Sequence, residues 1–296
     1  MKKLSNILNE SIFGKMSDKG RGETVKKEDL ITSKEELEER INALYKDQGN
    51  GDTLDVSSLG RCISCDDLSE LFSEFFYVKQ IIGLETWNVS NVIDISGMFY
   101  GCSNLTKLDI SNWDVSKVVD MRKMFYHCTS LKELNLSNWD VSNVTDMRKM
   151  FYDCKSIKEL NIDNWDVSKV TNMEDMFYNC KSLEELNISD WDVSKVTNMD
   201  EMFYNCRNLK KLDLSNWDVS KVINMNFMFS HCSQLEELNI SDWDVSNVIY
   251  MGDMFYNCTS LTELNIDNWD VSNAKNIVDM FHDCNKLINK PKWYNG

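Results

Sequence analysis

Cysteine is the residue type in this chain that could most readily do chemistry, because it recurs at a fixed step. It returns every 26 residues, at Cys102, Cys128, Cys154, Cys180, Cys206, Cys232, Cys258 and Cys284. A ladder of thiolates could bind soft metals or act in redox chemistry. Each cysteine also stands three residues after a phenylalanine, as Cys154 follows Phe151, on an apolar stripe. Because free cysteine is among the most buried residue types, we expect a column of reduced structural thiols.

The histidines and one C-x-x-C pair are further candidates for catalysis or metal binding. His127 and His231 precede column cysteines, but adjacent residues on a helix point in different directions, which argues against a Cys–His dyad. Cys62 and Cys65 lack the second ligand pair of a zinc site and the βαβ context of a redox motif. We expect this pair to belong to a terminal unit, with a disulfide as the alternative. Since no acid, base and nucleophile converge and no phosphate loop occurs, we predict no enzyme and no cofactor.

An aspartate column keeps the same step. It runs through Asp114, Asp140, Asp166, Asp192, Asp218, Asp244 and Asp270, with Asn88 first. Carboxylates that recur once in each 26-residue step could lie close together in a stack of repeats and share Ca²⁺. The alternative is an Asx-type turn, because Asp140 stands two residues before Ser142 and can accept its backbone N–H. The glycine-rich nonapeptide of calcium solenoids is missing, so we favour turn capping over Ca²⁺ binding.

These columns belong to eight repeats of 26 residues, each carrying one tryptophan. The tryptophans are Trp87, Trp113, Trp139, Trp165, Trp191, Trp217, Trp243 and Trp269. In residues 131–156 the leucines form L-x-x-L-x-L, typical of short strands, and the apolar residues from Val144 to Cys154 follow helical spacing. We predict an α/β repeat fold, a leucine-rich-repeat solenoid with a parallel short-strand sheet on one face and helices on the other. The tryptophans should stack as a spine that breaks register at Trp293, where the stack ends.

Three segments are predicted along the chain. Residues 1–32 form a flexible N-terminal arm or docking peptide, and residues 33–51 a capping helix and linker. Ser33 and Glu36 give the helix a capping-box pattern. Residues 52–296 form the solenoid, a degenerate cap followed by about eight repeats.

The repeat resembles a known family. The string W-D-V-S-x-V-x-x-M-x-x-M-F-x-x-C-x-x-L, seen from Trp139 to Ile157, is similar to the BspA-type leucine-rich repeats of bacterial and mycoplasmal surface proteins. The resemblance covers residues 52–290 and implies a surface adhesion or host-interaction protein. The segment Lys2–Ile12 is similar to the start of gut-bacterial and phage-encoded proteins, which implies a docking peptide.

The charge distribution excludes several classes of partner. The net charge of −16 falls entirely in residues 51–296. Such a surface repels nucleic acid and anionic membranes. No apolar run of 18 residues occurs and the N-terminus lacks the apolar core of a signal peptide, so we expect no membrane insertion. A cytoplasmic or assembly-associated location, including a virion, is favoured over secretion.

The outward columns that flank the strand leucines are the predicted binding surface. Its residues include Glu133, Asn135, Glu159, Asn161, Glu185, Asn187, Glu237 and Asn239. Near-identity between repeats fits a solvated face, and it also fits a repetitive partner. We expect a non-enzymatic scaffold that binds a protein or repetitive polymer with basic character. The alternative is a structural component tethered by residues 1–32 to a larger assembly such as a phage virion. The oligomeric state stays open.

Two aromatic residues depart from the repeat. Phe227 and Tyr250 replace charged or polar residues of the sister repeats. On a helix they would lie near each other and form a small exposed apolar patch with Ile223 and Ile249. This patch is a second candidate contact site. The alternative is that these residues have no binding role, since single exposed aromatic residues are common on protein surfaces. We expect Phe227→Asp to weaken a partner complex without lowering the melting temperature.

Overall fold

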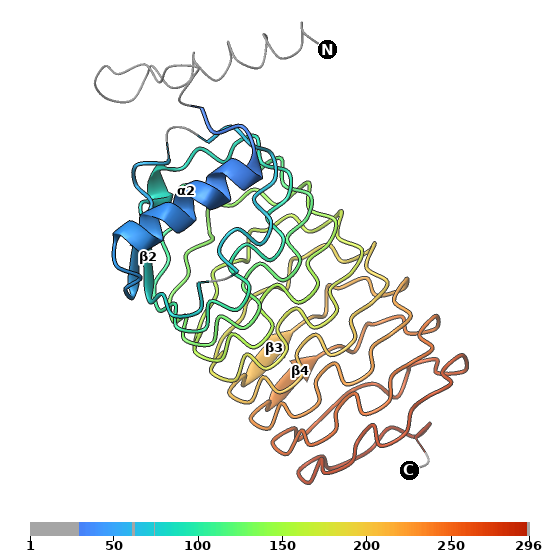
Figure 1. The fold of residues 1–296 in the computed structure, drawn as a ribbon. Helices are drawn as coiled ribbons and strands as arrows, with labels where there is room; N and C mark the ends of the chain where they lie inside the picture. Colours follow the sequence, from blue (N-terminus) through green and yellow to red (C-terminus); the bar gives the residue numbers. More distant parts are fainter. Residues whose placement is uncertain (1–29, 61–62, 74, 295–296) are drawn as a thin grey trace, which may run out of the picture.

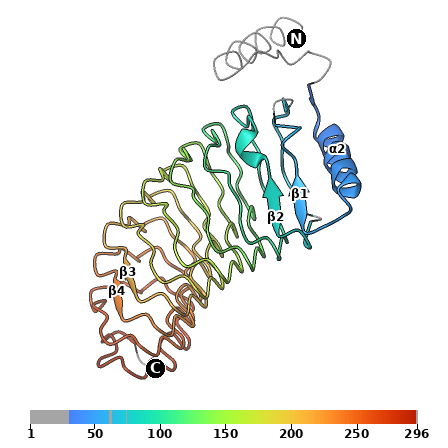
Figure 2. The same cartoon turned by 90° about the vertical axis from the view of Figure 1, so that its left-hand side faces the viewer.

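The computed structural model describes residues 30–60, 63–73 and 75–294. Within these residues the chain winds into a row of stacked rungs, with the helix α2 at one end and the C-terminal residues at the other (Figures 1 and 2). Most of the predicted docking peptide, and the tethering role inferred from it, lie outside the described residues. None of the described helices combines the length and apolar character needed to cross a bilayer.

The helix α2 (Lys34–Asp47) closes the N-terminal end of the core. Ser33 is its N-cap, and its hydroxyl accepts a hydrogen bond from the backbone N–H of Glu36 at 3.2 Å. Leu37 and Ile41 are buried on the side that faces the rungs. The predicted helix is therefore confirmed, and it covers apolar surface that the first rung would otherwise expose to water.

Short parallel strands form one face of the stack, which we call the strand face. β1 (Thr53–Asp55) pairs in parallel with β2 (Gln80–Ile82), and a 3-10 turn, η2 (Leu84–Thr86), follows. β3 (Lys211–Asp213) pairs in parallel with β4 (Glu237–Asn239). Other rungs meet here through single bridges, such as Lys107 with Glu133. The prediction of a solenoid with short parallel strands is confirmed.

The predicted helices of the repeats are wrong. In residues 144–154 alternate N–H groups point along the stack, so Met147 donates to the carbonyl of Asn172 at 3.3 Å. The residues between them close tight turns, as Met150 donates to the carbonyl of Met147 at 3.2 Å. Lys149 (φ 59°) and Asp153 (φ 65°) adopt the left-handed conformation, which ends any α-helix. Two successive turns bring apolar residues inward at intervals of three and four, and this spacing imitates a helix face.

These stacked turns create a second ladder, longer than the strand face. Parallel bridges run without a gap from Asp67–Asp94 to Tyr250–Asn276. We call this side the ladder face; its bridging residues include Asp94, Asp120, Asp146, Asn172, Asn198, Asn224, Tyr250 and Asn276. Rung-to-rung backbone hydrogen bonds thus replace the within-helix bonds that the sequence predicted.

Aromatic columns fill the interior between the two faces. The phenylalanine rings of successive rungs stack at 5.4 to 5.7 Å, from Phe72–Phe99 to Phe255–Phe281. The tryptophans form the predicted spine, and Trp139 donates its indole N–H to the carbonyl of Ile110 at 3.1 Å. The predicted break at Trp293 is wrong, because its ring stacks on Trp269 at 6.3 Å despite the shorter spacing.

Candidate functional site

A groove crosses the strand face over four successive rungs. It has a volume of about 1180 Å³, and its lining includes five predicted binding residues: Glu133, Asn135, Glu159, Asn161 and Glu185. The L-x-x-L-x-L pattern positions them, because burial of Leu134 (7% exposed) turns both of its neighbours outward. The groove therefore gathers side chains that lie 26 residues apart in sequence.

A neighbouring column that the sequence argument missed also lines the groove. Lys132, Lys158 and Glu184 precede the predicted glutamates by one residue, and the ammonium of Lys158 lies 3.4 Å from the carboxylate of Glu184. The L-x-x-L spacing could have revealed this column, because the two residues between the leucines cannot both face the core. The groove thus contains lysines as well as carboxylates, and it is less uniformly acidic than predicted.

The asparagine column is partly used by the fold. Oδ1 of Asn135 accepts hydrogen bonds from the backbone N–H (3.2 Å) and hydroxyl (2.8 Å) of Ser137. Oδ1 of Asn239 accepts from the hydroxyl of Ser241 at 3.4 Å. The outward amides are therefore turn-closing groups whose N–H₂ ends remain to meet a partner.

The other predicted residues of the strand face lie outside the groove lining. Asn187 belongs to the same rung as Glu185 but does not line the groove, and Glu237 and Asn239 belong to β4. Lys211 pairs with Glu237 across β3 and β4, with 2.5 Å between ammonium nitrogen and carboxylate oxygen. The candidate site is thus concentrated on residues 107–185.

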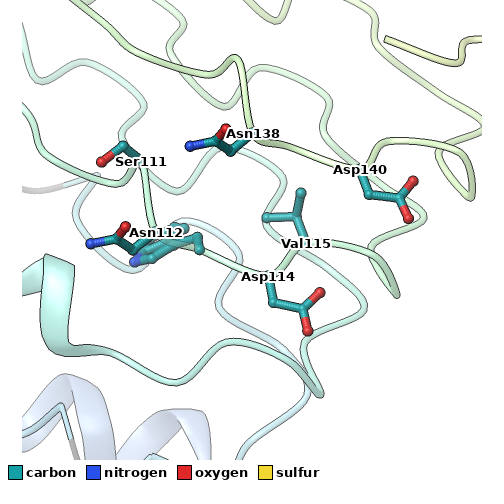
Figure 3. A pocket seen from close by; sticks show the side chains of 7 residues that line it. Ser111, Asn112, Asp114, Val115, Asn138 and Asp140 are labelled. Carbon is teal, nitrogen blue, oxygen red and sulfur yellow. The ribbon is translucent and has the colours of Figure 1, made fainter. Parts of the chain in front are cut away.

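The aspartate column closes the corners of the rungs. Asp114 and Asp140 line a smaller hollow of about 340 Å³, where they project from neighbouring rungs (Figure 3). Oδ1 of Asp140 accepts the backbone N–H of Ser142 at 3.0 Å, and the same bond recurs along the column. The turn-capping interpretation is confirmed. Among the described residues, no three His, Cys, Asp or Glu side chains form a group that could hold a metal ion.

The cysteine column is structural, as predicted. Cys102 to Cys284 are free and buried, and the Sγ of Cys154 donates to the carbonyl of Phe125 at 3.1 Å. Burial raises the pKa of Cys102 to about 12, which disfavours the reactive thiolate. Cys65 is also buried, and burial raises its pKa to about 11. Cys62 lies outside the described residues, so the proposed disulfide stays a prediction.

His127 faces away from the cysteine column. Its Nδ1 lies 2.7 Å from a carboxylate oxygen of Asp153, whereas Cys128 is fully buried. The argument against a Cys–His dyad therefore holds, although its geometry is that of a turn and not of a helix.

The predicted apolar patch forms only in part. Ile223 and Tyr250 are 44% and 43% exposed. Phe227 is half-buried, and its ring packs edge-on against Tyr204 with 6.5 Å between centroids. The expected helix face that would join Phe227 to Tyr250 is wrong, because these residues belong to stacked turns.

Comparisons with known proteins agree with the repeat architecture. Residues 66–186 and 181–294 match the family described as "Mycoplasma protein of unknown function, DUF285". No curated protein matches the chain.

Several solved repeat structures are similar to the chain. A leucine-rich repeat protein from Bacteroides ovatus is 19% identical at a TM-score of 0.37, over 76% of this chain and 69% of that one. A leucine-rich cell surface protein from Faecalibacterium prausnitzii is 14% identical at a TM-score of 0.31, over 82% and 83%. A TLR13–ssRNA13 complex is 16% identical at a TM-score of 0.37, over 73% of this chain and 32% of TLR13. The chain thus spans about a third of TLR13, and scores this low carry no argument about function.

Proposed function

The chain belongs to the DUF285 family and is a BspA-type leucine-rich repeat protein, and on this basis we propose that it is a non-enzymatic binding scaffold. Its partner is an extended protein segment or a repetitive polymer of basic character, bound along the groove of the strand face. The observation that carries this proposal is the gathering of Glu133, Glu159 and Glu185 from three rungs into one groove.

The chemistry of the groove favours a cationic, extended partner. Carboxylates of successive rungs repeat at roughly 5 Å, the usual spacing between neighbouring strands. A chain with regularly placed ammonium or guanidinium groups meets several carboxylates at once, and its backbone can accept from the amides of Asn135 and Asn161. The positive charge of Lys158 repels such a partner, although the carboxylate of Glu184 offsets this charge in part.

The location on a cell surface or in a host interaction is part of the same proposal. A regular polar face suits repeated weak contacts better than one tight contact, because similar rungs offer similar subsites. Adhesion depends on such multivalent attachment. The resemblance to BspA-type surface proteins supports this role.

A charge-reversal experiment tests the groove. The probe is a fluorescent peptide of alternating lysine and serine, with an alternating glutamate and serine peptide for comparison. We expect the lysine peptide to bind, and Glu159→Lys with Glu185→Lys to weaken its binding about tenfold or more. Lys158→Glu should strengthen it. Fluorescence anisotropy at two salt concentrations measures each dissociation constant.

The matched control is Glu263→Lys, which makes the same change in the same column outside the groove lining. It should leave the affinity within about twofold of the unaltered chain. Equal binding of both peptides, or equal loss in the control, would contradict the proposed groove.

A further inference from the structure

Two neighbouring columns of the ladder face change the sign of their charge at the same rung. In order along the stack, the first column is Arg122, Arg148, Glu174 and Asp200, and the second is Lys123, Lys149, Asp175 and Glu201. Backbone bonds between rungs hold each column in line, as Lys149 donates its N–H to the carbonyl of Glu174 at 2.9 Å. Both columns are therefore positively charged in the first two of these rungs and negatively charged in the last two.

The inner rungs neutralise each other within the chain. The ammonium of Lys149 lies 2.8 Å from a carboxylate oxygen of Glu174 and 3.2 Å from one of Asp175. In the part of the chain that the structure describes, Lys123, Asp200 and Glu201 form no ion pair. Arg122 and Arg148 are paired within their own rungs, at 2.5 Å from a carboxylate oxygen of Asp120 and 2.7 Å from one of Asp146. The unmatched charges of the outer rungs are therefore Lys123 at one end of the block and Asp200 and Glu201 at the other.

The acidic end also lacks partners for buried atoms. Oδ1 of Asp200 is buried without a hydrogen-bond partner. Burial raises the pKa of Glu201 to about 7, and the nearby Asp175 and Asp200 add to the effect. Half-buried carboxylates without a cation are costly, and a cation supplied from outside the chain would relieve that cost.

We propose that the ladder face is a self-association surface, on which two copies of the chain pack antiparallel about a two-fold axis. The axis lies between the rungs of Lys149 and Asp175, perpendicular to the stack. Each column then faces its own copy in reverse order. Lys123 meets Glu201 of the second copy, so these two unmatched charges are paired. Asp200 of the second copy meets Arg122, which its own Asp120 already neutralises in part. This interface does not use the groove of the strand face.

The rungs on either side of the charged block carry no charged residue in the column of Lys123. Gly97 precedes Lys123 in the column and Phe227 follows Glu201, so the antiparallel arrangement places Phe227 opposite the rung of Gly97 in the second copy, where the Glu70 side chain lies over the buried glycine. One rung further out, Glu70 would meet Asp253 of the second copy. The complementary region therefore ends after six rungs, a length of about 24 Å.

A second copy fits this face better than a charged polymer does. A basic peptide would meet Arg122, Lys123 and Arg148 over half of the block, and an acidic peptide would meet carboxylates over the other half. Only a partner whose charges run in the reverse order places an opposite charge against each rung of the block. The antiparallel second copy has that order by symmetry.

The partly exposed tyrosine column lies beside the charged block. Tyr126, Tyr152, Tyr178 and Tyr204 stack at 4.3 to 4.7 Å, and antiparallel packing brings this column against the same column of the second copy. Tyrosine supplies apolar contact area with a polar tip, which is common at protein interfaces.

Reciprocal charge reversal of the full chain tests the proposal. Sedimentation velocity should show the unaltered chain as a dimer, twice 34.5 kDa, that dissociates as salt is raised. Lys123→Glu and Glu201→Lys should each weaken self-association about tenfold or more, because each places two like-charged pairs in the dimer. An equimolar mixture of the two variants should dimerise again, since every pair in the mixed dimer is opposite in charge.

The variants suit the backbone at both positions. Lys123 (φ 57°) and Glu201 (φ 53°) already share the left-handed conformation, so each exchange introduces a residue type that the same column holds elsewhere. Circular dichroism melting confirms that both variants are folded. Asp279→Lys is the control, because it makes a similar change in the same column beyond the matched rungs, and it should not alter the dimer. A monomeric unaltered chain at low salt, or a mixture that stays monomeric, would overturn the proposal.

Discussion

Side-chain oxygens close the turns of each rung at the residue scale. Asp120 and its counterparts on the ladder face accept the backbone N–H two residues later, as in the 3.0 Å bond to Arg122. Tyr250 cannot do this, and Oδ1 of Asn226 in the preceding rung accepts the N–H of Gly252 at 2.8 Å instead. The backbone N–H that loses its acceptor through this substitution thus finds another acceptor in a neighbouring rung.

Ser230 is a residue whose polar group is not satisfied. It replaces the tyrosine of the column between Tyr204 and Tyr256, and its hydroxyl is buried without a partner. We expect Ser230→Ala to leave the free energy of unfolding unchanged or raise it by up to about 1 kcal/mol, because a buried unpaired hydroxyl is lost. Urea unfolding followed by tryptophan fluorescence measures the change.

Ser156 provides the matched comparison. Its hydroxyl donates to the carbonyl of Thr129 at 2.7 Å, and Ser156→Ala should lower the free energy of unfolding by about 0.5 to 1.5 kcal/mol. If Ser230→Ala proves as destabilising as Ser156→Ala, the hydroxyl of Ser230 has a partner and the explanation is wrong.

At the scale of the element, the stacked turns depend on a left-handed residue at two positions of each rung. Glycine fills them in one rung, at Gly97 (φ 59°) and Gly101 (φ 74°). Later rungs use Lys, Asp, Asn, Glu, His and Phe there, and none uses a β-branched residue. The conformation costs non-glycine residues energy, least for Asn and Asp, and the rung-to-rung hydrogen bonds offset this cost.

Substitutions at Asp253 test the left-handed turn. Asp253 has φ 55° and donates its backbone N–H to the carbonyl of Val278 at 2.9 Å. Asp253→Val should lower the free energy of unfolding by about 1 to 2 kcal/mol more than Asp253→Asn, because a β-branched side chain clashes in this conformation. Chemical denaturation of both variants gives the difference.

The control for this prediction is Thr262→Val, at an exposed position of the strand face without a positive φ, where the side chain makes no hydrogen bond within the described residues. It should change the free energy of unfolding by less than about 0.5 kcal/mol. Equal stabilities for Asp253→Val and Asp253→Asn would show that residue 253 is not left-handed in solution.

At the scale of the whole molecule, the same repeat places carboxylates in two opposite environments. Hydrogen bonds from Ser168 lower the pKa of the exposed Asp166, and bonds from Ser194 do the same for Asp192. Burial raises the pKa of Asp175 to about 6 and that of Glu201 to about 7. These two pairs of carboxylates therefore change the stability with pH in opposite directions.

The stability of the chain should peak between about pH 4 and pH 6. Asp166 and Asp192 stabilise the folded state above their unfolded pKa of about 4, and this contribution is lost as pH falls through their lowered folded pKa. Asp175 and Glu201 bind protons more tightly when folded. Their contribution is complete below about pH 4 and is lost as pH rises through about 6 to 7.

Urea titrations across pH 3 to 9 measure this profile, at high salt so that the proposed dimer is dissociated. Glu201→Gln should flatten the decline above about pH 6, because it removes a carboxyl group whose pKa the fold raises to about 7. Glu263→Gln is an exposed comparison on the strand face and should leave the profile unchanged. A decline that Glu201→Gln does not alter would refute this assignment.

The 26-residue step determined the repeat, the core columns and much of the candidate site. Apolar residues at fixed places in each unit have to be buried together, so the phenylalanine, cysteine and tryptophan columns could be predicted without coordinates. The outward position of Glu133 and Glu159 followed from the buried leucines beside them. The Ser33 cap and the Asp-x-Ser corners followed from local hydrogen-bonding chemistry.

Only the tertiary structure decided how the second half of each rung is bonded. Local spacing from Val144 to Cys154 fits a helix as well as two turns, and the choice depends on hydrogen bonds to a rung 26 residues away. The same contacts align Lys123, Lys149, Asp175 and Glu201 into one column and gather the groove from four rungs. These features are non-local, because each requires neighbouring rungs to be in place before its residues meet.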